Sequence, residues 1–243
     1  MDLPRVRAYY DEFAAGYEAK RRPNDPSGYH ALIDDLEVNI VERYGRGKDI
    51  LECGCGTGLL LERFAKFGKS AKGIDLSDGM LALAKERGLD VTQGSVTDLP
   101  FADESFDVTC SFKVLAHVED IGKALAEMTR VTRRGGIVLA EFYNPWSFRG
   151  ALKAFGPAGK ISAATKESAV FTRFDAPWQI PLSLPPSVDW EDSYGVRIVT
   201  PFAGAVRVPV LGKLLASAEH ALSATKAAYF AGFFVAALRR REG

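Results

Sequence analysis

The chain has 243 residues, of which 47% are hydrophobic, and its 31 basic residues balance its 31 acidic ones. This length and composition are typical of one large globular domain, or of a domain with a substantial insert. The zero formal net charge gives no sign of the basic surface that a nucleic-acid-binding protein needs. Three cysteines are too few for a disulfide framework, so we expect a reducing, cytoplasmic environment.

The first 45 residues are predicted to form two cap helices joined by a loop. In residues 4–20, Tyr10, Phe13 and Tyr17 recur on one helical face, and no apolar core typical of a signal peptide is present. Residues 21–28 have the Pro, Asn, Asp and Gly content of a loop. Residues 29–44 are predicted to form the second helix, which ends at a Gly-Arg-Gly sequence.

From residue 46 to 144, short apolar strands alternate with helices. The predicted strands are 48–53, 70–75, 90–94, 106–112 and 136–142, and the predicted helices are 59–68, 77–88 and 121–132. Ser77 is placed to cap the helix that it begins, and Gly88 lies just past the end of that helix. This alternation favours a parallel sheet covered on both faces, and such sheets bind ligands beyond the carboxyl ends of their strands.

The periodicity fails between residues 145 and 190, a stretch rich in proline and aromatic residues. It is too long and too apolar for a plain linker, so we expect an inserted cap that selects the substrate. The alternative is that the aromatic side chains of this stretch simply bury one another.

Residues 191–243 are predicted to complete the sheet, with strands at 194–202 and 228–238 and a short helix at 211–225. The apolar run that begins at Ala227 is well short of the roughly 20 residues of a membrane-spanning helix. We expect a buried strand there. A membrane-surface contact through Arg239–Arg241 is the alternative.

The sequence ILECGCGTGLLLERF, residues 50–64, places glycines at every second position between a strand and a helix: Gly54, Gly56 and Gly58. Glycine lets a ligand approach the backbone closely, and free N–H groups at a helix start attract polar or anionic groups. Asp75, at the end of the next strand, can accept both hydroxyls of a ribose. Loop and acid together predict a ligand that contains adenosine, although a tight turn with a capping acid would show the same residues.

The spacing of these glycines differs from the G-x-G-x-x-G of dinucleotide-binding loops. In addition, Glu52 precedes the loop, and its carboxylate would repel a pyrophosphate but suits an ammonium group. S-adenosylmethionine has an amino group, a ribose and an adenine, and it has no phosphate. The residues therefore favour S-adenosylmethionine over a nicotinamide dinucleotide. Cys53 and Cys55 have no second Cys or His pair at ligand spacing, so we predict no metal site.

Several motifs resemble the class I S-adenosylmethionine-dependent methyltransferases, in the broad UbiE-like or type 11 group. The resemblance covers roughly residues 9–143. It rests on LECGCGTG (51–58), GIDLSDGML (73–81), GSVTDLPFADESFDV (94–108), VLAHVED (114–120) and EMTRVTRRGGIVLAEF (127–142). It implies a Rossmann-like α/β fold, with a seven-stranded, mostly parallel sheet and helices on both faces. It also implies an antiparallel C-terminal strand and a cap inserted before the last two strands.

By the same resemblance, specific residues are expected to hold S-adenosylmethionine. Glu52 and Gly54 to Gly56, with Cys55 between them, should face the methionine part, and Asp75 should hold the ribose. Leu76 and Met80 should flank the adenine, and Phe112 should lie near the sulfonium. The family often has an acid at the position of Ser95, so adenine contacts fall here to the Ser95 hydroxyl or the Val96 backbone.

Methyl transfer from a sulfonium needs mainly alignment and desolvation, with a base only when the acceptor is protonated. His117 is the best-placed base, with a structural role as the alternative, and Tyr17 is a second catalytic candidate. Lys113 and Tyr143 are further pocket candidates. The expected function is methyl transfer to a small hydrophobic acceptor. A nicotinamide-dependent oxidoreductase and a non-catalytic cofactor-binding module are the alternatives.

Overall fold

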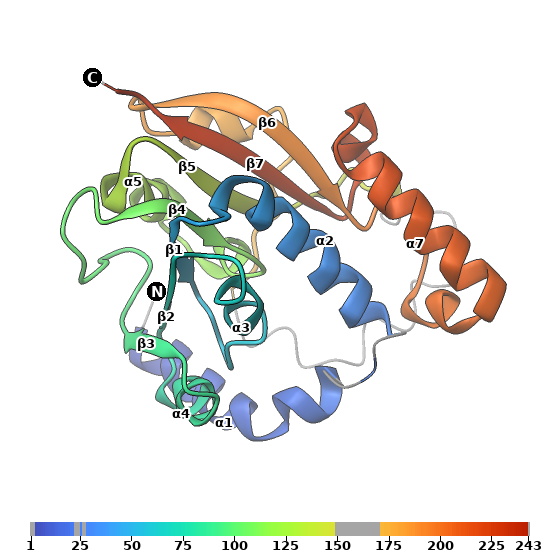
Figure 1. Ribbon diagram of the computed structural model, residues 1–243, viewed down its shortest axis with the longest axis horizontal. Coiled ribbons are helices and arrows are strands. Elements are labelled where there is room, and N and C mark those ends of the chain that lie inside the picture. The colour runs from blue at the N-terminus through green and yellow to red at the C-terminus, as the bar shows by residue number, and fades with distance from the viewer. Residues whose placement is uncertain (1–2, 22–24, 26–27, 149–170, 243) are drawn as a thin grey trace.

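The computed structural model describes residues 3–21, 25, 28–148 and 171–242. Among these residues, seven strands form one sheet in the order β3-β2-β1-β4-β5-β7-β6 (Figure 1). The strands are β1 Asp49–Cys53, β2 Ser70–Asp75, β3 Asp90–Gln93, β4 Phe106–Ser111, β5 Thr132–Tyr143, β6 Val188–Val196 and β7 Phe233–Arg240. Strands β1 to β5 pair in parallel, whereas β7 runs antiparallel to both β5 and β6. The predicted seven-stranded, mostly parallel sheet is therefore confirmed.

Helices cover both faces of this sheet because its strands are apolar on both sides. In β1, Ile50 and Leu51 point to opposite faces, and both are fully buried. Helix residues Leu36 and Phe64 pack with Ile50, and Leu125 packs with Leu51 on the other face. The described helices are α1 Leu3–Arg21, α2 Tyr29–Gly45, α3 Leu61–Phe64, α4 Asp78–Glu86, α5 Ile121–Val131 and α7 Pro209–Ser223, with 3-10 turns at Leu115–His117, Ile180–Ser183, Ala203–Arg207 and Lys226–Phe230.

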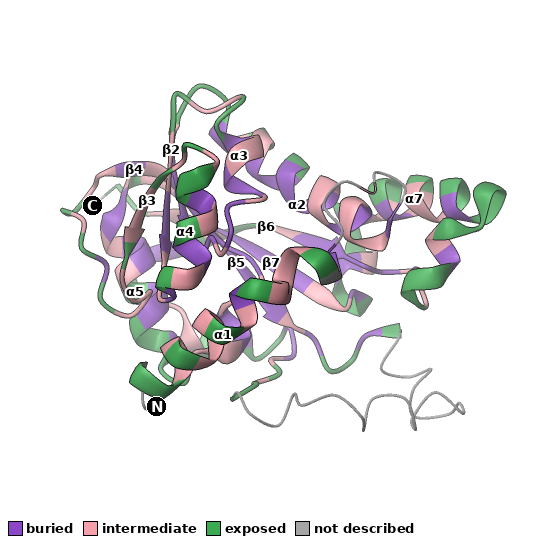
Figure 2. Cartoon of the chain, turned by 90° about the horizontal axis from the view of Figure 1, so that it is seen from below, coloured by how far each residue is buried: buried purple, intermediate pink, exposed green. Residues whose placement is uncertain are grey.

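Helix α1 differs from the other helices because it covers an end of the sheet (Figure 1). Figure 2 shows that most of its length is exposed or half-buried, whereas the sheet is buried. The Asp11 carboxylate accepts hydrogen bonds from Ser77 Oγ (2.6 Å) and Gly79 N (2.9 Å) at the start of α4. A Cβ atom on Gly79 would lie 3.1 Å from Asp11 Cα, so glycine permits this close approach.

One predicted helix is shorter than the sequence pattern indicates. The helix predicted at 59–68 is α-helical only over Leu61–Phe64. The amides of Lys66 and Phe67 donate to carbonyls three residues back, so the helix tightens and stops before Gly68.

The strand predicted at 194–202 has the wrong bounds. Strand β6 covers Val188–Val196 and therefore begins inside the predicted insert. It ends there because Arg197 has φ +65°, in the left-handed region. The next three amides then donate to the buried Glu219 carboxylate at 2.7–2.9 Å, and none is left for a ladder.

The apolar run near the C-terminus is likewise divided. Its first part forms the 3-10 turn Lys226–Phe230, which the Thr225 hydroxyl caps, and β7 follows. The arginines offered for a membrane contact are paired with acids: Arg239 with Glu191 (2.6 Å) and Arg241 with Asp189 (2.8 Å). None of the described helices has the length and apolar character needed to cross a membrane.

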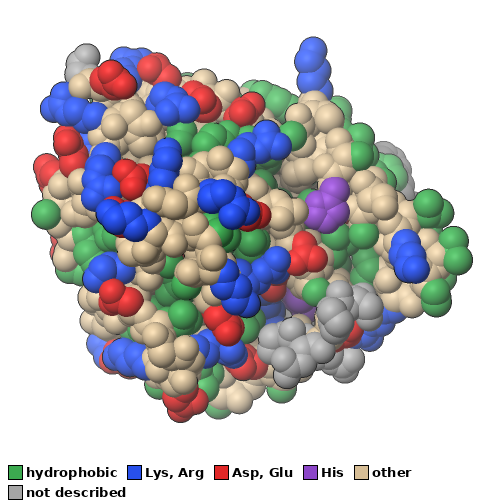
Figure 3. Space-filling view, in the orientation of Figure 1, with side chains coloured by type: hydrophobic (Ala, Val, Ile, Leu, Met, Phe, Trp, Pro, Cys, Tyr) green, Lys and Arg blue, Asp and Glu red, His purple; other side chains and the backbone are tan. Residues whose placement is uncertain are grey.

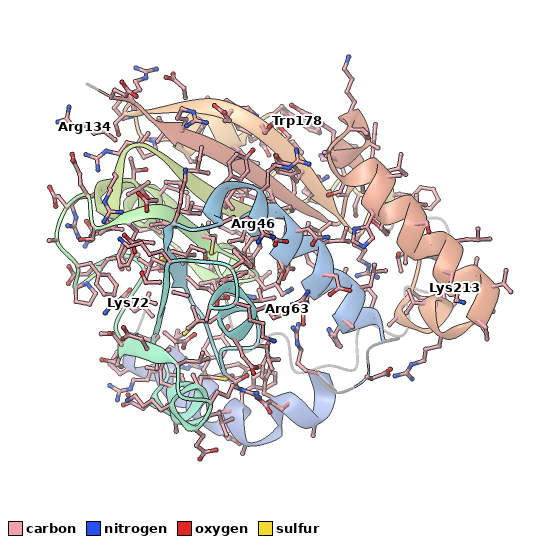
Figure 4. All side chains as sticks on the ribbon, in the orientation of Figure 1. Arg46, Arg63, Lys72, Arg134, Trp178 and Lys213 are labelled. Carbon is pink, nitrogen blue, oxygen red and sulfur yellow. The ribbon has the colours of Figure 1, made fainter. Side chains whose placement is uncertain are left out.

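The surface carries charge and apolar area in different places. Lys and Arg side chains lie over the left part of the space-filling view, and apolar side chains gather over α7 at its right edge (Figure 3). The exposed large apolar residues of α7 are Val210, Leu211 and Leu214, with Lys213 beside them (Figure 4). Surface ion pairs join neighbouring elements, as Arg63 of α3 does with Asp35 of α2 (2.8 Å).

Candidate functional site

A cavity of about 760 Å³ lies at the carboxyl ends of β1, β2, β4 and β5, beneath α1. This is the position at which parallel sheets bind ligands. The residues predicted from sequence to bind the cofactor or act in catalysis all line it: Tyr17, Glu52, Gly54, Cys55, Gly56, Asp75, Leu76, Met80, Ser95, Val96, Phe112 and His117. Lys113 and Tyr143 line it as well. The structure thus brings these residues together, and their individual roles are taken up below.

The three glycines of the loop have two different surroundings. Gly54 (φ +80°) and Gly58 (φ +82°) have left-handed backbones, and a Cβ atom would lie 2.2 Å from Val114 and 2.3 Å from Leu89, respectively. Gly56 (φ +54°) has nothing within 4 Å of the position of a Cβ atom. Because Gly56 lines the cavity, that open space is available to a ligand.

Glu52 is the buried acid of the loop. Its Oε2 atom has no hydrogen-bond partner among the described residues, although the residue is only 3% exposed. Burial raises the pKa of Glu52 well above its usual range, and the nearby Glu37 carboxylate adds to the increase. A buried acceptor without a donor is costly, so an ammonium group in the cavity would stabilise Glu52 as a carboxylate.

Asp75 ends β2 and is held by the loop that follows β1. Its Oδ2 atom accepts a hydrogen bond from Gly56 N (2.8 Å), and Oδ1 accepts one from Ser77 N (2.9 Å). Burial raises the pKa of Asp75, and these two N–H groups oppose the increase. Each carboxylate oxygen retains a lone pair, so Asp75 can accept further hydrogen bonds from hydroxyls in the cavity. Glu52 and Asp75 together are called the acidic wall.

Beyond Asp75, the cavity is lined by apolar and weakly polar groups. Met80 is 4% exposed and begins the buried face of α4. The Ser95 hydroxyl accepts a hydrogen bond from Thr97 N (3.2 Å) and lies 2.8 Å from Thr97 Oγ1. The predicted contact of Ser95 with an adenine would therefore share a hydroxyl that already stabilises its own turn.

His117 ends the 3-10 turn after β4. Its Nδ1 atom lies 2.9 Å from the Phe171 carbonyl oxygen. Because a carbonyl only accepts, Nδ1 must carry a proton, and the neutral ring then has its lone pair on Nε2. The ring stands edge-on to Tyr143, with centroids 5.8 Å apart. This geometry assigns the tautomer that a base would need.

None of the described residues of the predicted insert, 145–148 and 171–190, lines the cavity. Within the described part, Trp146 (65%), Phe174 (61%) and Trp178 (58%) are exposed, and the rings of Trp146 and Trp178 pack against each other with centroids 5.8 Å apart. They are not among the residues that line the cavity. Phe155, Lys153, Lys160 and Lys166 lie outside the described residues. A role of the insert in choosing the acceptor therefore stays a prediction.

A second group of charged residues at the cavity was missed by sequence reasoning, except for Lys113. Arg21 and His30 line the cavity beside Lys113, and these three residues are called the basic wall. Acids lie behind it: Asp34 and Glu37 from α2 and Glu141 from β5. The one sequence signal was Glu141, an acid inside the apolar strand GIVLAEF.

Comparison with known proteins identifies the central segment. The family described as "Methyltransferase domain" matches residues 51–140. A demethylmenaquinone methyltransferase from Renibacterium salmoninarum is 47% identical over 131 residues, covering 48% of this chain and 55% of the relative. One from Thermobifida fusca is 37% identical over 146 residues, covering 56% and 61%. The chain spans about half the length of the curated relatives it matches.

A solved structure shows the same fold over the whole chain. It is an S-adenosylmethionine-dependent methyltransferase from Thermotoga maritima, described as a possible histamine N-methyltransferase. Its TM-score is 0.69 at 18% identity, with coverage of 97% of this chain and 99% of the other.

S-adenosylmethionine is the cofactor of the matched family, and the cavity fits it. The unpartnered Glu52 oxygen suits its ammonium group, and the open space at Gly56 admits close contact. Asp75 has acceptor capacity for its ribose. A pyrophosphate would instead meet the acidic wall, so the nicotinamide alternative is not favoured. Residues 51–140 therefore match the methyltransferase family, and the chain has the fold of an S-adenosylmethionine-dependent methyltransferase.

Proposed function

We propose that this protein transfers a methyl group from S-adenosylmethionine to a small hydrophobic organic acceptor by in-line displacement. The observation that supports this most directly is the composition of the cavity at the carboxyl ends of the strands. It joins the glycine loop and the acidic wall to the aromatic side chains Tyr17, Phe112 and Tyr143. One part suits an amino acid and a ribose, and the other suits a flat apolar molecule.

In this proposal, Glu52 binds the cofactor's ammonium group, the backbone from Gly54 to Gly56 contacts its methionine part, and Asp75 binds its ribose. The adenine lies between Leu76 and Met80, with Ser95 and Val96 at its edge, and Phe112 lies near the sulfonium. When bound, S-adenosylmethionine supplies an electrophilic methyl group on a positively charged sulfur. The protein's own contribution is then to align the acceptor and to exclude water.

Two residues are proposed to act on the acceptor. In its neutral form, His117 has its lone pair on Nε2, because the Phe171 carbonyl accepts the proton on Nδ1. Nε2 can take the proton of an acceptor hydroxyl or amine as the methyl group arrives. Tyr17 of α1 lines the same cavity and covers it from the opposite side to the strands, which keeps water out.

The names of the relatives suggest where to look for the acceptor. Demethylmenaquinone methyltransferases are the matched relatives, so a demethylmenaquinone-type naphthoquinone is the first acceptor that we would assay. This acceptor is a proposal for the present chain.

Titration calorimetry with S-adenosylhomocysteine tests the proposal. The native chain should bind it, and Asp75→Ala should weaken binding by about 30-fold or more, since a buried charged hydrogen-bond acceptor is lost. The matched control is Asp90→Ala, an exposed acid on the neighbouring strand that pairs only with Lys72 in the described structure. Absence of binding by the native chain, or equal binding by Asp75→Ala, would refute the proposal. Binding of NAD instead would support the oxidoreductase.

A further inference from the structure

The basic wall is part of a charged cluster assembled from four segments. Lys113 Nζ lies 2.5 Å from Glu37 Oε2 and 3.6 Å from Asp34 Oδ1. The backbone N of Lys113 donates to Glu141 Oε1 at 2.8 Å. Arg21 of α1 donates to both oxygens of Asp34 at 2.6 and 2.7 Å. The cluster therefore links α1, α2, β5 and Lys113, which is the second residue after the end of β4.

The cluster is layered, with cations toward the cavity and acids behind them. Arg21 and Lys113 line the cavity, whereas Asp34, Glu37 and Glu141 do not. Glu37 is 0% exposed and Glu141 is 1% exposed, while the Lys113 side chain keeps 23% of its surface. A ligand in this part of the cavity would meet positive groups first.

Lys113 holds a backbone conformation that is unfavourable for its residue type. Its φ of +60° lies in the left-handed region, which costs a non-glycine residue about 1 kcal/mol or more. The hydrogen bond from its N–H to Glu141 and the ion pair to Glu37 stabilise that conformation. Glycine would adopt this backbone without strain, so the Lys113 side chain is held at the cavity at a conformational cost.

The cations keep their charge and have donors to spare. Burial alone would lower the pKa of Lys113, but the Glu37 and Glu141 carboxyl groups reverse this and raise it, so the ammonium group persists. Of its three N–H donors, Glu37 accepts one, and Asp34 lies beyond hydrogen-bond distance. Arg21 Nε is a buried donor with no hydrogen-bond partner among the described residues.

The two acids behind Lys113 account for the charge balance. Burial raises the pKa of both Glu37 and Glu141, and each has an oxygen without a donor in the described part of the chain. One proton shared between Glu37 and Glu141 would satisfy both oxygens. With that proton, Arg21 and Lys113 are balanced by Asp34 and one carboxylate. The cluster is then neutral before a ligand binds.

We propose that Lys113 and Arg21 bind an anionic oxygen of the methyl acceptor, either an ionised phenol or enol or a carboxylate. This inference rests on the proposed function and extends it from an apolar acceptor to an apolar acceptor with one acidic group. Glu37 and Glu141 act as positioning residues that hold the ammonium group of Lys113 toward the cavity. The proton of the acceptor's acidic group goes to solvent when the acceptor binds.

The experiment compares flat probes that differ in one group, with S-adenosylhomocysteine saturating at pH 7.5. The native chain should bind 2-naphthoate at least about tenfold more tightly than the neutral 2-naphthamide, since hydrogen bonds to charged groups are the stronger ones. Bound 2-naphthol should show the absorption of its naphtholate if the site takes phenols or enols. Preference for naphthoate without naphtholate absorption would instead assign a carboxylate acceptor.

Lys113→Met should abolish the preference, and Lys123→Met, which alters an exposed lysine of the same cavity, should retain it. Because Lys113→Met leaves buried acids behind, the double variant Lys113→Met/Glu37→Gln provides a second test with the partner charge also removed. Equal affinity for the two probes, no binding of either, or a preference that survives in both Lys113 variants would overturn this inference. A separate titration with S-adenosylhomocysteine decides the proposed function, so the two failures are distinguishable.

Discussion

The two charged walls of the cavity contrast in polarity and in origin. The acidic wall presents Glu52 and Asp75, with an unpartnered carboxylate oxygen, from two neighbouring strand ends. The basic wall presents Arg21 and Lys113, with an unpartnered guanidinium N–H, from elements far apart in the chain. In the described part of the chain, each wall keeps one buried polar atom without a hydrogen-bond partner: Glu52 Oε2 in the acidic wall and Arg21 Nε in the basic wall. One cavity can therefore offer binding groups to a cationic ligand and an anionic ligand together.

The acidic wall is tested most sharply by measuring whether Glu52 releases a proton when a ligand binds. Burial raises the pKa of Glu52, so without ligand the group is protonated at pH values below that raised pKa. An ammonium group needs the ionised form, so binding should release a proton, and affinity should rise with pH through that pKa.

Glu52→Gln should abolish this proton release and weaken S-adenosylhomocysteine binding by about 30- to 100-fold, or about 2–3 kcal/mol. Calorimetry in two buffers of different ionisation enthalpy measures the release. A binding enthalpy that does not depend on the buffer for the native chain would contradict the assignment.

A second test separates the glycine loop's contact with ligand from its backbone strain. Gly56 (φ +54°) and Gly47 (φ +70°) both have left-handed backbones and nothing within 4 Å of a Cβ position, but only Gly56 lines the cavity. Alanine at either position should cost about 1 kcal/mol in the free energy of unfolding. Only Gly56→Ala should also lose about tenfold in S-adenosylhomocysteine affinity, because its methyl group occupies ligand space. Equal affinities of the two variants would show that Gly56 faces no ligand.

The acids behind the basic wall can be tested through the pH dependence of the free energy of unfolding. Because burial raises the pKa of Glu141, the folded chain keeps a proton that the unfolded chain loses above about pH 4.3. The unfolded state then binds fewer protons, so stability should fall as pH rises from about 5 toward the raised pKa.

Glu141→Gln keeps a donor for Glu37 and an acceptor for Lys113 N, and it cannot ionise. It should therefore flatten the curve by up to about 1.4 kcal/mol per pH unit. Urea unfolding from pH 5 to 9 measures this, with Glu86→Gln on the exposed side of α4 as the control. Parallel curves for the native chain and Glu141→Gln would mean that Glu141 is ionised.

The smallest effect is expected from adding an acid at Ser95, which lines the cavity beyond Asp75. Ser95→Asp should preserve the turn, since an Asp side chain can also accept from Thr97 N. Its second oxygen can accept from an adenine amino group, so S-adenosylhomocysteine affinity should increase about threefold. Weaker binding by Ser95→Asp than by Ser95→Ala would show that the adenine lies elsewhere.

The sequence predicts a part of the site well when the residues of that part lie close together along the chain. Glycine loop, helix cap and acid follow one another along a strand–turn–helix segment, so their spacing alone places them. The Ser77 cap is confirmed by the hydrogen bond from Met80 N to Ser77 Oγ (3.1 Å). The basic wall depends on the packing of α1 and α2 against β5, and no spacing in the sequence joins Glu37 to Glu141.

The same reason explains the fold predictions that were wrong. Strand β6 stops at Val196 because a glutamate on α7 takes the next amides, and that contact joins residues about twenty positions apart. The apolar residues 227–230 have strand-like composition, yet the Thr225 hydroxyl turns them into a 3-10 turn. Composition predicts burial in both cases, whereas distant or single polar contacts decide where the ladder stops.

The place of β7 in the sheet has a consequence for synthesis on the ribosome. Strand β7 lies between β5 and β6, pairing Tyr143 with Phe233 and Val196 with Phe233. Neither β5 nor β6 has this neighbour until roughly a hundred residues after β5 have been made, about 5–20 seconds at ordinary elongation rates. During that interval β5 keeps an unpaired edge, of the kind that pairs with other chains. A nascent chain that still lacks β7 is therefore the species whose exposed β5 edge a chaperone would protect most.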